Sequence, residues 1–140
     1  MKKSTSCIIT MMLMLLCHIG YAQSLQKGSL LGLHYGNVNL HPDVTMNQFK
    51  SFYMSAVVPD VEKNMPGVKV IVAKGLRGEN ENAFAVMYLF DSEATRNKYF
   101  NTEGALTDAG KAAMEKTQAV SEKLSKMGTV TTKYTDWLIQ

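Results

Sequence analysis

The residues best suited to chemistry lie in the segment LGLHYGNVNLH, which brings two histidines, a tyrosine and two asparagines into one β-rich run. The ordinary pKa of a histidine lies near neutrality, so His34 is the candidate general base of this protein. His41 precedes Pro42 in a predicted turn, where local hydrogen bonding is expected. The two histidines also lie on opposite sides of an extended strand. A shared metal ion is therefore disfavoured, and no metal site is predicted.

The alternation of side chains along a strand predicts which way His34 points. The bulkier set of residues is expected to pack on the helices. This places His34 on the opposite face, between two glycines that leave room for a ligand. The alternative is that the glycines relieve crowding and that His34 is hydrogen-bonded to a neighbouring strand. The helix-facing set is Leu31, Leu33 and Tyr35, and the set facing the cavity is Gly32, His34, Gly36 and Val38.

Three further residues join His34 as candidates for ligand binding. Tyr53 lies on the apolar stripe of a predicted helix, where it contributes to a core or to a cavity wall. Arg77 lies at the mouth of a predicted hairpin. Trp137, on the terminal strand, lines a cavity or anchors a contact between subunits, and the second role is favoured because aromatic residues are enriched at interfaces. Tyr88 is assigned to the core.

The N-terminus predicts export. Two lysines precede the apolar run CIITMMLMLLCHIG, and Ala22 follows as a small residue at a cleavage site, which is the order of a secretory signal peptide. We therefore expect cleavage after Ala22 and a periplasmic or secreted protein. The run is too short to span a membrane. Lipidation at Cys17 is the alternative, but Leu16 stands where lipoprotein signals have a small residue.

The remaining residues, 23–140, are predicted to form a single domain. Both cysteines of the chain, Cys7 and Cys17, lie within the predicted leader, so the domain lacks thiol chemistry and disulfides. Of the 15 Lys and Arg residues two lie in the leader, and the 12 acidic residues nearly balance the others. Without a basic run there is no reason to expect nucleic-acid binding.

The periodicities predict six elements. Thr45 and Gln48 form a capping box that begins the first helix, and Pro59 is expected to kink that helix. Gly128 is expected to close the last helix at its C′ position. The elements are a strand over 29–40, a helix over 45–65, strands over 68–76 and 83–90 joined as an antiparallel hairpin, a helix from 91 that is interrupted at 101–104 and resumes to 127, and a strand over 129–139.

This order gives an α+β fold. Two βαβ halves with right-handed crossovers form the ferredoxin-like split βαβ arrangement, with a four-stranded antiparallel sheet and both helices on one face. No residues remain to cover the other face of the sheet. We therefore expect a homodimer in which two such sheets form a dimeric α/β barrel.

Two segments also resemble a known group of proteins. TMNQFKSFYMSAVVPDVEKNMPGVK has aromatic residues early in a helix, a proline within it and PG before the next strand, and AFAVMYLFDSEATRNKYF has a strand that ends in an aromatic residue before Asp-Ser and a helix. These features resemble the EthD-like and antibiotic-biosynthesis-monooxygenase-like dimeric α/β barrels over about residues 30–140. The resemblance implies a barrel that holds a ligand in its interior. EthD-like sequences often carry a histidine two residues before that proline, where this chain has Val57.

Two functions are hypotheses at this point. The first is a cofactor-independent oxygenase, isomerase or lyase that acts on a small, apolar ring compound, with His34 as general base. The second is a binding module that sequesters a small hydrophobic or aromatic ligand without turnover. No cofactor is predicted, and haem chemistry is disfavoured because the second helical region contains no histidine to serve as an axial ligand.

Overall fold

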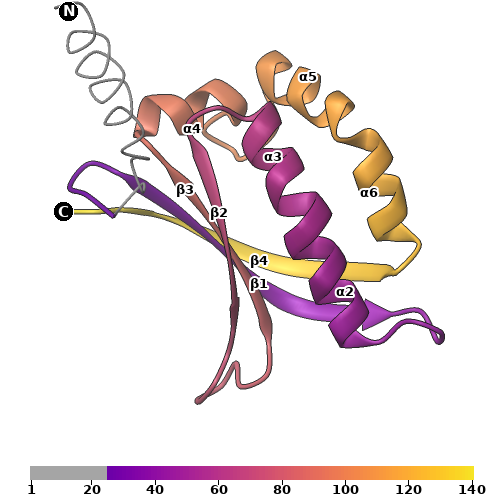
Figure 1. Ribbon diagram of the computed structural model, residues 1–140. Helices are drawn as coiled ribbons and strands as arrows, with labels where there is room; N and C mark the ends of the chain where they lie inside the picture. The colour runs from indigo at the N-terminus through magenta and orange to yellow at the C-terminus, as the bar shows by residue number, and fades with distance from the viewer. Residues whose placement is uncertain (1–24) are drawn as a thin grey trace, which may run out of the picture.

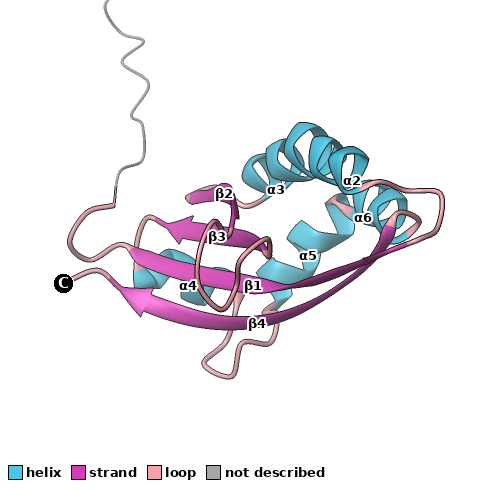
Figure 2. Ribbon diagram, turned by 90° about the horizontal axis from the view of Figure 1, so that it is seen from below, coloured by secondary structure: helices cyan, strands magenta, loops and turns pink. Residues whose placement is uncertain are grey.

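The sheet forms one layer of the structure and the helices form the other, all on the same face of the sheet (Figures 1 and 2). The computed structural model describes residues 25–140, and the predicted signal peptide lies outside them. Among the described residues, no helix is long and apolar enough to cross a membrane. The strands are β1 (Leu30–Leu40), β2 (Val68–Lys74), β3 (Phe84–Phe90) and β4 (Gly128–Leu138), and the helices are α2 (Met46–Phe52), η1 (Tyr53–Val57), α3 (Val58–Asn64), α4 (Glu93–Tyr99), α5 (Asp108–Lys116) and α6 (Gln118–Ser125).

The four strands are ordered β2-β3-β1-β4, and every neighbouring pair is antiparallel. With the helices on one face, this is the predicted α+β, ferredoxin-like arrangement. β1 is paired with β4 along its whole length, from Leu30 opposite Leu138 to Leu40 opposite Gly128, without a bulge. The facing of every side chain on β1 is therefore fixed by simple alternation.

The first helical segment begins as its sequence predicts. The Thr45 hydroxyl accepts a hydrogen bond from the Gln48 backbone N–H, and the Gln48 side chain accepts one from the Thr45 N–H, so the capping box is present. The predicted kink at Pro59 takes the form of a π-helical turn, η1, directly before α3. There the Val58 N–H donates to the Tyr53 carbonyl, five residues back. The wider turn accommodates a proline that has no N–H to donate.

The second helical region is divided more finely than its sequence predicts. Ser92 and Thr107 are the N-caps of α4 and α5, and their hydroxyls accept hydrogen bonds from the backbone N–H groups of Thr95 and Gly110. A further break at Thr117, whose hydroxyl donates to the Met114 carbonyl, separates α5 from α6. The prediction of Gly128 as a helix C′ residue is wrong. Gly128 is the first residue of β4, where a side chain would crowd the backbone of β1 at Asn39.

The predicted facing of β1 is also wrong. His34 is paired with Val86 on β3, and Val86 lies in the core beneath the helices, so His34 points toward the helices. Large side chains from β3 and from the first helix, such as Phe84 and Phe49, pack in that core. β1 contributes Leu30, Val38 and Leu40 at its two ends, and Gly32, His34 and Gly36 in its middle. Its bulky residues Leu31, Leu33 and Tyr35 lie on the helix-free face.

The helix-free face of the sheet is mainly apolar over β2, β3 and the adjoining half of β1, and we name it the open face. Leu89, opposite Leu31, is buried on it, whereas the edge-strand residues Ile71 and Trp137 are exposed to 44% and 55%. By strand register the open face consists of Leu31, Leu33, Tyr35, Lys69, Ile71, Ala73, Ala85, Met87, Leu89, Lys133, Thr135 and Trp137, and of the polar Asn37, Asn39, Thr129 and Thr131 where β1 and β4 extend past the other strands.

Candidate functional site

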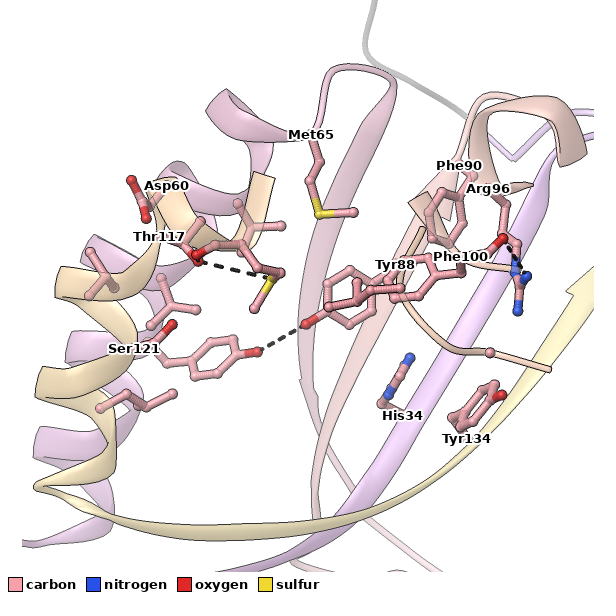
Figure 3. Close-up of a pocket in the computed structure, with 18 of the residues that line it drawn as sticks. His34, Asp60, Met65, Tyr88, Phe90, Arg96, Phe100, Thr117, Ser121 and Tyr134 are labelled. Carbon is pink, nitrogen blue, oxygen red and sulfur yellow. Dashed lines mark hydrogen bonds between the residues drawn. The ribbon is translucent and has the colours of Figure 1, made fainter. Parts of the chain in front are cut away.

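A cavity of about 380 Å³ lies between the sheet and the helices (Figure 3). Residues from the sheet, from both helical segments and from the loop after α4 surround it, and its walls are mainly apolar. Its size is within the range of small-molecule sites in proteins. The lining residues are His34, Tyr53, Val57, Asp60, Val61, Met65, Tyr88, Phe90, Arg96, Phe100, Gly104, Leu106, Met114, Thr117, Val120, Ser121, Leu124, Tyr134 and Asp136.

His34 lies on the sheet side of the cavity, between two tyrosine rings. The ring of Tyr134 on β4 is stacked against it, with centroids 5.3 Å apart and planes at 16°. The ring of Tyr88 on β3 meets it edge-on at 4.9 Å. His34 thus lines the cavity within one subunit, and not the interior of a barrel between two sheets as its sequence position predicted. Figure 3 shows His34 and Tyr134 side by side on the strands.

The surroundings of His34 favour its neutral form. Burial lowers the pKa of His34 below its ordinary value, and the negative charge of Asp136 opposes this shift in part. A neutral imidazole has one nitrogen that accepts a hydrogen bond or a proton. At neutral pH His34 is therefore a base, which is the form required for proton abstraction.

Two tyrosine hydroxyls meet at the wall of the cavity. Tyr53 and Tyr88 lie 3.5 Å apart between their hydroxyl oxygens, and either one can donate to the other. Burial raises the pKa of Tyr53 far above its ordinary value, and the neighbouring Tyr88 adds to the shift. Burial also raises the pKa of Tyr88. Both hydroxyls remain protonated, so one hydrogen bonds within the pair and the other is left to donate to a ligand.

An ion pair holds the loop that closes one end of the cavity. Arg96, buried on α4, places its Nε and Nη2 2.9 and 2.8 Å from Asp136 Oδ2 on β4. Its Nη1 donates to the carbonyl oxygens of Phe100 and Asn101, where the loop begins. The guanidinium thus bonds to a carboxylate on the sheet and to the backbone of the loop, and these bonds together fix the loop to the sheet.

The prediction that the glycines beside His34 leave room for a ligand is wrong, because other groups of the protein occupy that space. At Gly32 a Cβ atom would lie 3.1 Å from Asp136 Oδ1, so the Asp136 carboxylate occupies that space. At Gly36 a Cβ atom would overlap the backbone of Thr131 on β4. Both glycines allow close approach of neighbouring groups.

Tyr134 owes its position to a third glycine. Gly104, in the loop after α4, has a φ of +81°, and a Cβ atom there would overlap the Tyr134 hydroxyl group. The hydroxyl lies against the bare backbone of the loop while the ring covers His34. Tyr134 is 49% exposed, so it forms the boundary between the cavity and solvent.

Asp60 is a charged residue on the helical side of the cavity. The Asn64 side chain donates to Asp60 Oδ1, with the nitrogen 3.2 Å away, and to the Asp60 carbonyl oxygen at 2.9 Å. Oδ2 is buried and has no hydrogen-bond partner among the described residues. In Figure 3 Asp60 lies with Thr117 and Ser121 on the helical side, across the cavity from His34.

The structure brings together two of the four predicted ligand-binding residues. His34 and Tyr53 line the cavity. Arg77 is exposed in the connection between β2 and β3, and Trp137 lies on the open face, so neither lines the cavity. Sequence reasoning missed Asp60, Arg96, Tyr134 and Asp136. A signal existed for Asp60, which lies three residues after Val57 and hence on the apolar stripe of its helix.

No group of three or more His, Cys, Asp and Glu residues that could hold a metal ion occurs within residues 25–140. The polar groups of the cavity are instead spread over its walls. What the arrangement offers is a neutral base, a pair of phenolic donors and a carboxylate around an apolar space.

Comparison with known proteins shows that this chain shares its fold with solved structures. No family model matches the sequence, and no curated protein matches it. A NIPSNAP family protein from Agrobacterium tumefaciens is structurally similar with a TM-score of 0.54 and 12% identity, over 84% of this chain and 91% of the other. This match supports the α+β fold.

Weaker structural matches include the groups that the sequence resembles. SnoaB, a cofactor-independent oxygenase from Streptomyces nogalater, matches with a TM-score of 0.45 and 10% identity over 79% of this chain and 91% of the other. An EthD family protein from Bacillus halodurans matches with a TM-score of 0.39 and 15% identity, over 74% and 96% of the two chains.

Proposed function

We propose that this protein binds a small, apolar ring compound in the cavity between its sheet and its helices, and that His34 acts there as a general base. The observation that carries the proposal is the His34 imidazole at the wall of an apolar cavity of about 380 Å³, in contact with Tyr88, whose hydroxyl pairs with that of Tyr53. Because the structural likenesses are of the fold alone, the case for chemistry depends on this geometry.

The geometry suits a proton abstraction. His34 would accept a proton from an acidic C–H or O–H group of the ring compound. The hydroxyl of the Tyr53–Tyr88 pair that is left to donate would stabilise the negative charge that develops on a substrate oxygen. Such a step begins a cofactor-independent oxygenation, an isomerisation or an elimination.

A non-catalytic binding role is the second candidate, and the packing of His34 favours it. One face of the imidazole is stacked on Tyr134, and Tyr88 meets the ring at a second side. Such contacts stabilise a ring in a fixed position. In this alternative His34 shapes the cavity of a module that sequesters a hydrophobic ligand.

Oxygen consumption with a panel of hydroquinones and polyphenols tests the catalytic proposal, with product analysis for isomerised or cleaved compounds. His34→Gln should abolish turnover while retaining binding. His41→Gln is the matched control, because His41 is exposed in the turn after β1 and does not line the cavity. Binding without turnover in the wild type would favour the sequestering role.

We also propose that the protein is exported after cleavage at Ala22 and that two copies associate through their open faces to form a barrel. The apolar part of the open face supports association, because an exposed apolar patch commonly marks an interaction site. A stable contact would bury more than about 1,000 Å² in total. Mass spectrometry of the exported protein should find Gln23 at its N-terminus. A lipid on Cys17 or an uncleaved chain would contradict the export proposal.

A further inference from the structure

The buried carboxylate oxygen of Asp60 has chemical consequences for the ligand. A buried polar atom without a hydrogen-bond partner destabilises the folded state. The two hydrogen bonds from Asn64 fix the side chain through Oδ1 and through the backbone, so Oδ2 remains without a donor. The Asp60 side chain is thus held in place with one oxygen, Oδ2, free to accept a hydrogen bond from a ligand.

No other residue that lines the cavity supplies that donor. Arg96 is the only lysine or arginine among the lining residues, and its guanidinium bonds to Asp136 and to loop carbonyls. The Thr117 hydroxyl donates to the Met114 carbonyl. Asp60 Oδ2 therefore has no hydrogen-bond donor, and Asp60 forms no salt bridge, among the described residues.

We propose that the ligand of this cavity is an amphipathic amine, with an apolar, ring-sized body and a protonated amino group that donates to Asp60 Oδ2. This inference rests on the proposed function, since it specifies the ligand of the same cavity. A charge-assisted bond from an ammonium group satisfies the orphan oxygen and neutralises its charge. The apolar body occupies the space toward the Tyr53–Tyr88 pair.

Three probes of nearly equal size separate the contributions: 2-phenylethylamine, 2-phenylethanol and propylbenzene. They carry an ammonium group, a hydroxyl group and a methyl group at the same position. Desolvation alone favours the hydrocarbon in an apolar cavity. A preference for the amine therefore reports a specific ionic partner. NMR titration of the purified protein measures each dissociation constant and locates the perturbed resonances.

We expect the amine to bind about 10- to 100-fold more tightly than propylbenzene, the range for a hydrogen bond to a charged group. Asp60→Asn should remove this preference and leave propylbenzene binding unchanged. Asp43→Asn is the control, because Asp43 is an exposed acid before α2 that does not line the cavity. Asn64→Ala keeps the charge but releases its orientation, so it should reduce the preference, and it provides a second test if Asp60→Asn does not fold.

Each other outcome overturns a defined part of the proposal. Equal or tighter binding of propylbenzene, or a preference that survives Asp60→Asn, would remove Asp60 as the recognition residue while leaving the cavity as a ligand site. Tightest binding of the alcohol would replace the amine by a neutral donor. If none of the three probes perturbs the cavity resonances, the proposed function itself fails.

Discussion

The two faces of the sheet both carry apolar side chains, but only one of them is covered by helices. On the helix-covered face, β1 adds Leu30, Val38 and Leu40 at its ends and Gly32, His34 and Gly36 in its middle. On the open face, β1 supplies Leu31, Leu33 and Tyr35, and the edge residues Ile71 and Trp137 remain exposed. The first face is completed within one chain and encloses a cavity. The second lacks a cover within the described residues.

Association through the open face should show the largest effect. We expect the purified protein to be a dimer at micromolar concentration and the double variant Ile71→Lys, Trp137→Lys to be a monomer, because two buried charges on each subunit would face an apolar partner surface. Light scattering measures the mass. Met54→Lys is the control, since Met54 is 60% exposed on the helical layer. A monomeric wild type, or a dimeric double variant, would show that this face does not form the interface.

Truncation of the completed core should have the next largest effect. Phe49 is fully buried on α2, and Phe49→Ala should lower the free energy of unfolding by about 3–5 kcal/mol. Ile71→Ala on the open face should cost less than about 1 kcal/mol when it is compared with the parent protein in a Trp137→Lys background, at a concentration where light scattering finds both to be monomers. Urea denaturation measures both. Similar losses at the two positions would mean that the open face is covered within one chain.

The glycines of β1 provide a smaller test on the helix-covered face. Gly36→Ala should lower stability by about 2–3 kcal/mol, because the new methyl group overlaps the backbone of β4 at Thr131. Gly32→Ala should cost less than about 1 kcal/mol, because its methyl group meets the Asp136 carboxylate, a side chain that can shift by a few tenths of an ångström. Urea denaturation that ranks Gly32→Ala as the more harmful change would contradict this explanation.

The smallest effect concerns pH. The folded pKa of His34 lies below its unfolded value, so the unfolded chain binds more protons in the interval between the two. The contribution of His34 to stability is therefore complete above about pH 6.5 and is lost as the pH falls through the folded pKa. His34→Gln should show a shallower loss of stability than the wild type between pH 7 and pH 5. Parallel pH profiles by thermal melting would show that burial does not perturb His34.

The sequence predicted the elements of the fold better than the facing of its strands. The alternation of residues along a strand and the capping box at Thr45 and Gln48 are local properties of the sequence, and both are present in the structure. The facing of His34 depends on which elements fill the core. That is a property of the assembled layers, and the large residues of β1 were a misleading cue because a second apolar face exists.

The candidate site was predictable only where its residues belong to a local pattern of the sequence. His34 and Tyr53 were identified from residue type and helical periodicity. Arg96 and Asp136 are 40 residues apart in the chain, and their pairing arises only when α4 packs against the end of β4. Such long-range partners leave no local pattern. Asp60, by contrast, interrupts an apolar stripe, and an acid in that position was available as a cue.

The π-helical turn η1 has a consequence for how this cavity can change by insertion or deletion of residues. A π turn contains one residue more than the corresponding stretch of α-helix, and each α-helical residue rotates the chain by about 100°. The turn absorbs that extra residue, because the Val58 N–H still reaches a carbonyl oxygen, that of Tyr53. Loss of one residue within 53–57 would therefore restore an α-helical bond between the same two groups and leave Asp60 and Val61 at the cavity wall. Loss of one residue within α2 or α3 would instead rotate the two parts of the helix relative to each other by about 100° and change which side chains line the cavity.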